Sequence, residues 1–208
     1  MLDIPTEYCE RLSHLLGPEP LNVLSNVAFL LAASFAYRAV RSHELKSVAL
    51  PILLSAVGIA SAWWHLFHTR TGDIADTLSI FLFACVAGVL FLYKTFSSKV
   101  RVTVFALVTT VLVLGGEQVR WLNGSMPYVV VLLALGLAGM VYAQKFPSKR
   151  LSVLLMFSTF LLALTLRSLD SALCSFIPIG THFLWHILVA FFGYQMILLV
   201  VHKPESRL

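Results

Sequence analysis

Two histidines near the C-terminus stand at a spacing that suits metal binding. His182 and His186 are four residues apart within the apolar stretch 177–201. In a helix, this spacing places both imidazoles on one face, close enough to hold a single ion. The pair alone is a weak indication, because histidines near helix ends often only form hydrogen bonds. We interpret the isolated His14, His43 and His202 in that simpler way.

A second polar pair occurs in the apolar stretch 48–67, where Ser61 and His65 are also four residues apart. Asp76 follows eleven residues after His65, where the next apolar stretch begins. Buried polar groups beside lipid are costly unless they coordinate an ion or pair with one another. We therefore expect Ser61, His65 and Asp76 to share one site with the two later histidines. His68 could support that site or face the lipid headgroups.

The composition indicates that the helices carrying these side chains lie in a membrane. The chain has 208 residues, of which 59% are hydrophobic and 12% charged, and its mean hydropathy is +0.87. Soluble domains carry about 25% charged residues, and disordered chains are poor in apolar ones, so both classes are excluded. The net charge of +5 does not indicate nucleic-acid binding, because the basic residues are scattered between apolar runs.

Seven apolar stretches are long enough to be considered as membrane spans. They cover residues 21–37, 48–67, 77–93, 102–114, 126–143, 151–166 and 177–201. The fourth is short, so we expect its helix to include the charged flanks. The sequence predicts an all-α, seven-transmembrane-helix bundle formed by a single domain, 1–208. An extracytoplasmic segment, 1–20, precedes the bundle, and a short cytoplasmic tail, 202–208, follows it.

Charged residues predict the orientation of this bundle. Of the 15 basic residues, 11 fall in the loops after the odd-numbered spans and in the tail, which marks these as cytoplasmic. Eight of the ten acidic residues fall on the opposite side or at the helix ends facing it. The N-terminus is thus expected outside and the C-terminus in the cytoplasm. The outer side is where oxygen ligands for a hard cation gather.

Together these motifs resemble the superfamily of alkaline ceramidases and adiponectin-type receptors. The matching pattern is SxxxH at 61–65, an aspartate eleven residues later, and HxxxH at 182–186. The N-terminal segments EYCER and EPLNVLSN look like the alkaline ceramidase branch, including its bacterial members. The resemblance implies that His65, His182 and His186 ligate zinc, and that a zinc-bound water is the nucleophile. Asp76 would serve as general base, and Ser61 would stabilise the oxyanion.

The same resemblance implies a calcium ion and a disulfide. Calcium would be held by Glu7, Glu10, Glu19 and the backbone carbonyl of Tyr8, although Glu7 stands where an aspartate is common and Leu12 replaces a frequent polar ligand. The simpler alternative is that these acids only cap a helix and face solvent.

Cys9 and Cys174 match positions that pair in the family, and both fall on the outer side, where disulfides persist. Cys85 lies inside 77–93 and is expected to be a small buried side chain. Asp170 could either pair with Arg167 or serve the same loop.

The resulting expectation is a zinc-dependent hydrolase that cleaves the amide bond of ceramide or a similar N-acyl lipid into a long-chain base and a fatty acid. Its partner would be a membrane lipid, and no protein partner is indicated. We expect a bacterial inner membrane with the site towards the periplasm, or an ER or Golgi membrane in a eukaryote. Two alternatives remain, an adiponectin-receptor-like receptor with structural zinc and little turnover, and an ion or proton transporter.

Overall fold

The computed structural model describes residues 8–12, 19–40, 45–116 and 121–202. Glu7, His14 and His43 lie outside these ranges, and so does the tail beyond His202. The described part is helical and contains no strand. Its elements are α1 (Cys9–Leu12), α2 (Pro20–Ser25), α3 (Val27–Val40), α4 (Leu45–Phe67), α5 (Arg70–Thr95), α6 (Lys99–Gly116), α7 (Trp121–Gly124), α8 (Met126–Lys145), the 3₁₀ turn η1 (Pro147–Lys149), α9 (Arg150–Leu173) and α10 (His182–Val201).

Seven of the described helical segments are long and apolar enough to cross a membrane, which confirms the predicted fold class. The first span combines α2 and α3 over Pro20–Val40, and the sixth joins η1 to α9. The fourth span takes in its N-terminal charged flank, as expected, because α6 begins at Lys99; the C-terminal flank at Glu117 lies outside the described residues. Large apolar side chains such as Leu107, Val111 and Phe191 remain exposed on the bundle, as contact with lipid requires. The side on which each terminus lies stays a prediction.

The beginnings of α5 and α10 differ most from those that the hydropathy predicted. α5 starts at Arg70 instead of 77, because the Thr69 side chain caps it by accepting a hydrogen bond from the backbone N–H of Gly72. Asp76 therefore lies within the second turn of α5 rather than at its start. α10 starts at His182 instead of 177, because the chain turns at Gly180, whose φ of +70° favours glycine.

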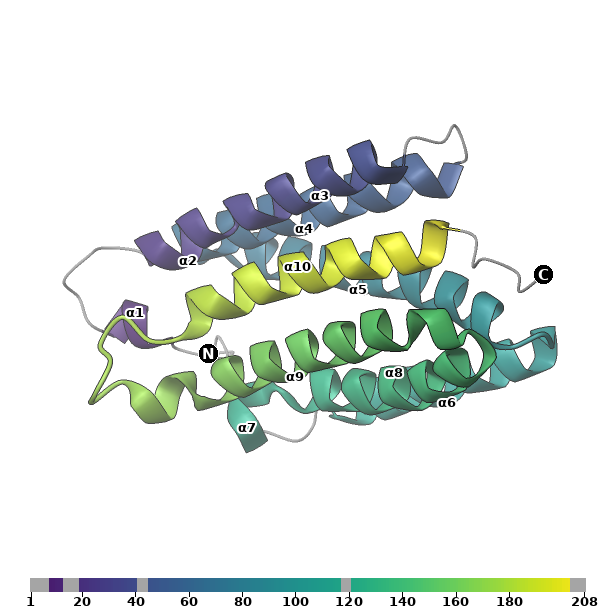
Figure 1. The fold of residues 1–208 in the computed structure, drawn as a ribbon. Coiled ribbons are helices and arrows are strands. Elements are labelled where there is room, and N and C mark those ends of the chain that lie inside the picture. The colour runs from purple at the N-terminus through teal and green to yellow at the C-terminus, as the bar shows by residue number, and fades with distance from the viewer. Residues whose placement is uncertain (1–7, 13–18, 41–44, 117–120, 203–208) are drawn as a thin grey trace.

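α10 is the most buried of the seven spans, and α6 is the least buried. Figure 1 shows α10 lying between α3 and α4 on one side and α9 on the other. Close approach is helped by Gly193 of α10, where a Cβ atom would lie 2.6 Å from Cδ1 of Leu54 in α4. The helix that carries the HxxxH motif is thus held on both sides by packed neighbours. The beginning of α10 lies at the same end of the bundle as α1 and α7 (Figure 1).

Candidate metal centre

Three buried imidazoles converge at the α1 end of the bundle. His65 lies in the last turn of α4, and His182 and His186 occupy the first two turns of α10. One nitrogen from each ring lies within 4.8 Å of the other two, and all three residues are buried. Zinc–nitrogen bonds are about 2.0–2.1 Å long, so this separation is close to the span of one coordination sphere. Residues far apart in sequence thus form a group that could hold a metal ion.

Two of these rings are oriented by hydrogen bonds through Nδ1. His65 Nδ1 contacts a carboxylate oxygen of Glu19, and His186 Nδ1 lies 2.8 Å from the Ser25 hydroxyl. These contacts leave Nε2 of both rings available for an ion, and a second partner of this kind is usual for metal-binding histidines. The buried Nδ1 of His182 has no hydrogen-bond partner among the described residues, so none of them commits this nitrogen to a structural hydrogen bond. The three rings therefore fit a metal that favours imidazole, such as zinc.

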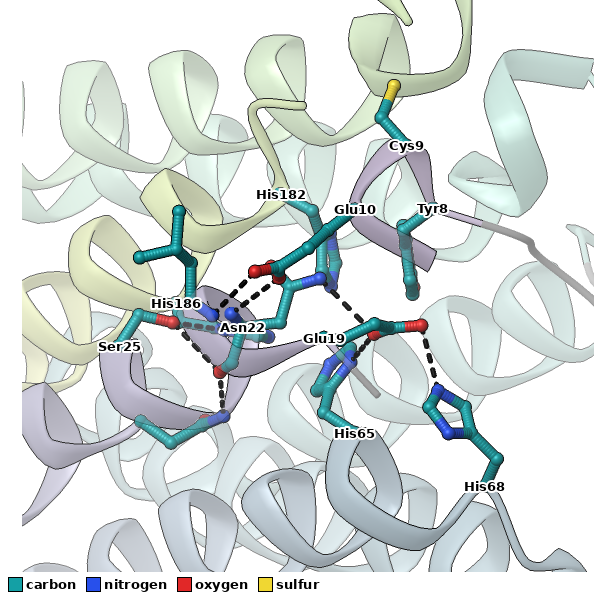
Figure 2. Close-up of polar contacts among 12 residues, drawn as sticks. Tyr8, Cys9, Glu10, Glu19, Asn22, Ser25, His65, His68, His182 and His186 are labelled. Carbon is teal, nitrogen blue, oxygen red and sulfur yellow. Dashed lines mark hydrogen bonds and ion pairs between the residues drawn. The ribbon is translucent and has the colours of Figure 1, made fainter. Parts of the chain in front are cut away.

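The residues just before α1 and α2 cover this group, as Figure 2 shows. The Tyr8 ring stacks on the His182 ring with centroids 3.6 Å apart and an angle of 14° between the planes. Glu19 bridges two histidines at the C-terminal end of α4. One of its carboxylate oxygens contacts His65, and the other lies 2.8 Å from Nε2 of His68. His68 is thus a supporting residue that holds Glu19 against His65, which settles the role that the sequence left open.

Glu19 and His68 both have left-handed backbone conformations, with φ of 47° and 50°. This region is unfavourable for residues other than glycine and costs about 1–2 kcal/mol per residue. Two such residues in direct contact indicate that the surrounding structure enforces their positions. Burial by itself raises the pKa of Glu19, but the hydrogen bonds and charges of His65 and His68 outweigh it and lower that pKa. Glu19 is therefore ionised where it contacts His65.

The described residues expected to bind calcium all have partners within the protein. Glu10 accepts hydrogen bonds from the backbone N–H groups of Leu21, at 2.6 Å, and Asn22, at 2.9 Å. The Tyr8 carbonyl accepts one from the backbone N–H of Arg11 at 3.1 Å. Burial raises the pKa of Glu10, against the lowering effect of its two backbone donors. Within the described ranges Glu10 ties α1 to α2, and calcium binding there stays a prediction.

Asp170 positions the start of α10 and does not pair with Arg167. Its Oδ1 accepts the backbone N–H groups of Thr181, at 2.6 Å, and His182, at 2.9 Å, while Oδ2 accepts the N–H of Cys9 at 3.0 Å. A Cβ atom at Gly180 would lie 2.2 Å from Oδ1, so only glycine fits beside this carboxylate. Of the two roles considered for Asp170, service to its own loop is the correct one. One buried carboxylate fixes both the N-terminal segment and a candidate metal ligand.

The predicted disulfide between Cys9 and Cys174 is present. It joins α1 to the residue that follows α9, across a sequence separation of 165. Cys9 is buried and adjoins both Tyr8, which stacks on His182, and Glu10. The bridge therefore braces the cover of the histidine group. Cys85 is free and partly buried in α5.

Replacing Cys174 by serine is expected to lower the free energy of unfolding by about 2–4 kcal/mol, since a bridge over a long loop restricts the unfolded chain. Thermal unfolding of purified protein, with and without a reductant, measures the effect. Cys85→Ser serves as the matched control and should change little. Equal stability of Cys174→Ser and the parent protein under oxidising conditions would show that the bridge does not brace the fold.

Ser61 and Asp76 come from the two helices that meet at Thr69. Ser61 is buried one turn before His65 on α4. Asp76 lies on α5, and its Oδ1 atom is buried without a hydrogen-bond partner among the described residues. α4 and α5 pack against each other, so the two residues belong to neighbouring helices. A carboxylate oxygen that is buried and unpaired is available to accept a proton from a ligand.

Sequence comparison supplies an independent observation. The model of the ceramidase family matches residues 5–203, nearly the whole chain. The chain belongs to the ceramidase family. No curated protein sequence matches it. Family membership suggests a lipid amide hydrolase, and the long apolar helices suggest an integral, multi-pass membrane protein with a lipid substrate.

Several supporting residues of this ceramidase-family site were missed by reading the sequence. Ser25 was quoted only as part of a motif, although it contacts His186. A signal was present, because Asn22, Ser25 and Asn26 are polar residues at helical spacing at the start of an apolar span. Nothing in the sequence indicated that Glu19 would join His65 to His68. That contact depends on two left-handed residues whose conformations have no sequence signal.

Proposed function

We propose that the chain is a zinc-dependent amidohydrolase that cleaves the amide bond of ceramide or a similar N-acyl membrane lipid. The observation that carries this proposal is the group of three buried imidazoles in a chain of the ceramidase family. His65, His182 and His186 would hold the ion. When bound, zinc would supply a Lewis acid that lowers the pKa of a coordinated water towards neutrality. Calcium, which the family resemblance also implies at Glu7, Tyr8, Glu10 and Glu19, stays a secondary prediction.

Asp76 is proposed to move the protons. Its unpaired Oδ1 would accept a proton from the attacking water, as a general base must. The protonated carboxyl would then donate that proton to the amine nitrogen as the carbon–nitrogen bond breaks. This transfer avoids release of an unprotonated amine, which is a poor leaving group. The products are a long-chain amine and a fatty acid.

Ser61 is proposed to stabilise the oxygen of the scissile carbonyl as negative charge develops on it. Its hydroxyl is buried one helical turn from His65 and can donate one hydrogen bond at that depth. Removing a single donor of this kind typically lowers turnover by about 10²–10³-fold. Ser61→Ala should therefore have a kcat reduced by about that factor while it still binds metal. Ser55→Ala, on the same helix, is the control and should keep kcat; an unchanged kcat in Ser61→Ala would exclude the role.

The proposed activity is tested by incubating the purified protein with ceramide and with other N-acyl lipids in mixed micelles. Release of fatty acid together with an equal amount of amine would support the hydrolase. Saturable lipid binding without either product would instead support an adiponectin-receptor-like receptor with structural zinc. Ion flux into proteoliposomes without hydrolysis would support a transporter.

A further inference from the structure

A buried arginine stands beside the candidate metal centre and is not used by the proposed reaction. Arg167 lies near the end of α9, and only 7% of its surface is exposed. The ion pairs of the described residues join Glu19 to His65 and His68, and none of them includes Arg167. A buried cation in a helix long and apolar enough to span a membrane, with no ion pair among the described residues, is costly and is by default an indication of function.

Only part of the Arg167 guanidinium is used to support the fold. Nη1 donates to the Asn123 carbonyl at 3.0 Å and to the Ser125 hydroxyl at 2.6 Å, holding the turn before α8. Among the described residues, Nη2 donates to the Tyr8 hydroxyl, and the length of this contact, 3.5 Å, exceeds that of an ordinary hydrogen bond. The guanidinium of Arg167 has five N–H donors in one plane, and the described residues provide strong acceptors for only some of them.

The underused side of Arg167 lies next to the metal-binding rings. The Tyr8 ring, whose hydroxyl faces Nη2, stacks on His182. The guanidinium carbon lies 5.0 Å from the Tyr128 ring centroid and 5.7 Å from that of Trp185, the residue before His186. The charge of Arg167 also acts on Asp76, with which it makes no ion pair among the described residues. It is therefore a fixed positive charge at the edge of the site.

We propose that Arg167 binds the carboxylate of a lipid at this centre, so that the site prefers ligands carrying one negative charge. This inference rests on the proposed function. An arginine fork matches a carboxylate in shape, and one buried cation balances one negative charge rather than the larger charge of a phosphate monoester. During the proposed reaction Asp76 loses its negative charge when it accepts a proton. The positive charge of Arg167 is then less balanced, which favours an anionic ligand beside it.

The carboxylate could come from either side of the amide bond. It could belong to the amine portion, as in an N-acyl amino acid, or it could be the fatty acid that hydrolysis releases. The two sources are distinguished by paired ligands. N-palmitoylglycine and N-palmitoylglycinamide differ only in the headgroup charge, and palmitate and hexadecan-1-ol differ at the end of the acyl chain.

The test measures kcat/KM for the two amides and, separately, the stabilisation of the full-length metal-loaded protein by palmitate or hexadecanol. The preference is the value for the charged ligand divided by the value for its neutral partner. In at least one of the two pairs, Arg167→Gln is expected to lower this ratio by about 10- to 100-fold, as loss of a buried charge-assisted hydrogen bond would. Values for the neutral member should stay within about 3-fold. If the preference for N-palmitoylglycine falls, Arg167 binds a carboxylate of the amine headgroup. If the stabilisation by palmitate falls, Arg167 binds the carboxylate of the released fatty acid.

Two controls separate recognition from folding. Ser125→Ala removes the 2.6 Å structural contact but keeps the cation, so it should retain the preference. Arg70→Gln removes an exposed arginine at the start of α5 and should also have no effect. The proposal is overturned if Arg167→Gln affects charged and neutral ligands alike, if it changes neither pair, or if Ser125→Ala reproduces its effect. Absence of any amide turnover would contradict the proposed function, and the palmitate pair would still decide the role of Arg167.

Discussion

His182→Ala is expected to reduce fatty-acid release by at least about 100-fold and to lose the bound metal. The imidazole of His182 is one of the three buried groups whose nitrogens lie within 4.8 Å of one another. Losing a residue that only supports a metal ligand commonly costs 10–100-fold, so losing a ligand should cost more. The measurement is hydrolysis of an N-acyl lipid by the purified variant, with the metal content determined on the same sample.

His202→Ala is the matched control for this variant. His202 is exposed just after α10, and its ring contacts the Leu198 carbonyl at 3.0 Å. It should keep both metal and activity. Full activity in His182→Ala would show that the ring is not a ligand, and the proposed site would have to be abandoned.

Asp76→Asn is expected to lower kcat by about 10²–10⁴-fold while metal content and KM change little. The amide has nearly the same shape as the carboxylate but cannot accept the proton of the attacking water, and loss of a general base typically has a cost in this range. Steady-state kinetics with a single N-acyl lipid measures the effect. Because Oδ1 of Asp76 has no hydrogen-bond partner in the described structure, the substitution should not disturb folding.

Asp73→Asn, one helical turn earlier in α5, provides the comparison for Asp76→Asn. It removes a half-buried acid of the same helix that has no place in the proposed reaction, and kcat should stay within about 3-fold of the parent value. If both variants were equally impaired, the effect would reflect the negative charge of this helix end. If Asp76→Asn instead lost its metal, Asp76 would be a structural support rather than a base.

The number of spans could be predicted because hydropathy and length alone identify a membrane helix. The starting residues of α5 and α10 could not, because they depend on polar contacts that hydropathy does not register. Thr69 extends α5 by a side-chain cap, and Asp170 holds the turn before α10 by accepting hydrogen bonds from its first residues. Asp170 is distant in sequence from both Cys9 and His182, so its role became visible only in the folded chain.

The grouping of the three histidines was predictable, because helical spacing places His182 and His186 on one face and Ser61 and His65 have the same spacing near the end of their own span. The assignment of these histidines as zinc ligands came from the family resemblance. The contacts that orient the rings were less accessible. Ser25 and Glu19 reach the histidines from a short segment that folds back over α4 and α10. The sequence suggests Arg167 as an ion-pair partner for Asp170. Asp170 instead accepts hydrogen bonds from three backbone N–H groups, and Arg167 makes no ion pair among the described residues.

Zinc K-edge X-ray absorption of the full-length wild-type protein, combined with elemental analysis, tests the central claim most directly. We expect one zinc ion per chain, coordinated by three imidazole nitrogens at about 2.0–2.1 Å and one further light atom. The same preparation of a variant with His65, His182 and His186 all replaced by alanine should contain none. A wild-type protein that binds no transition metal in zinc-replete medium, or a spectrum without imidazole scattering, would contradict a zinc site formed by these three histidines.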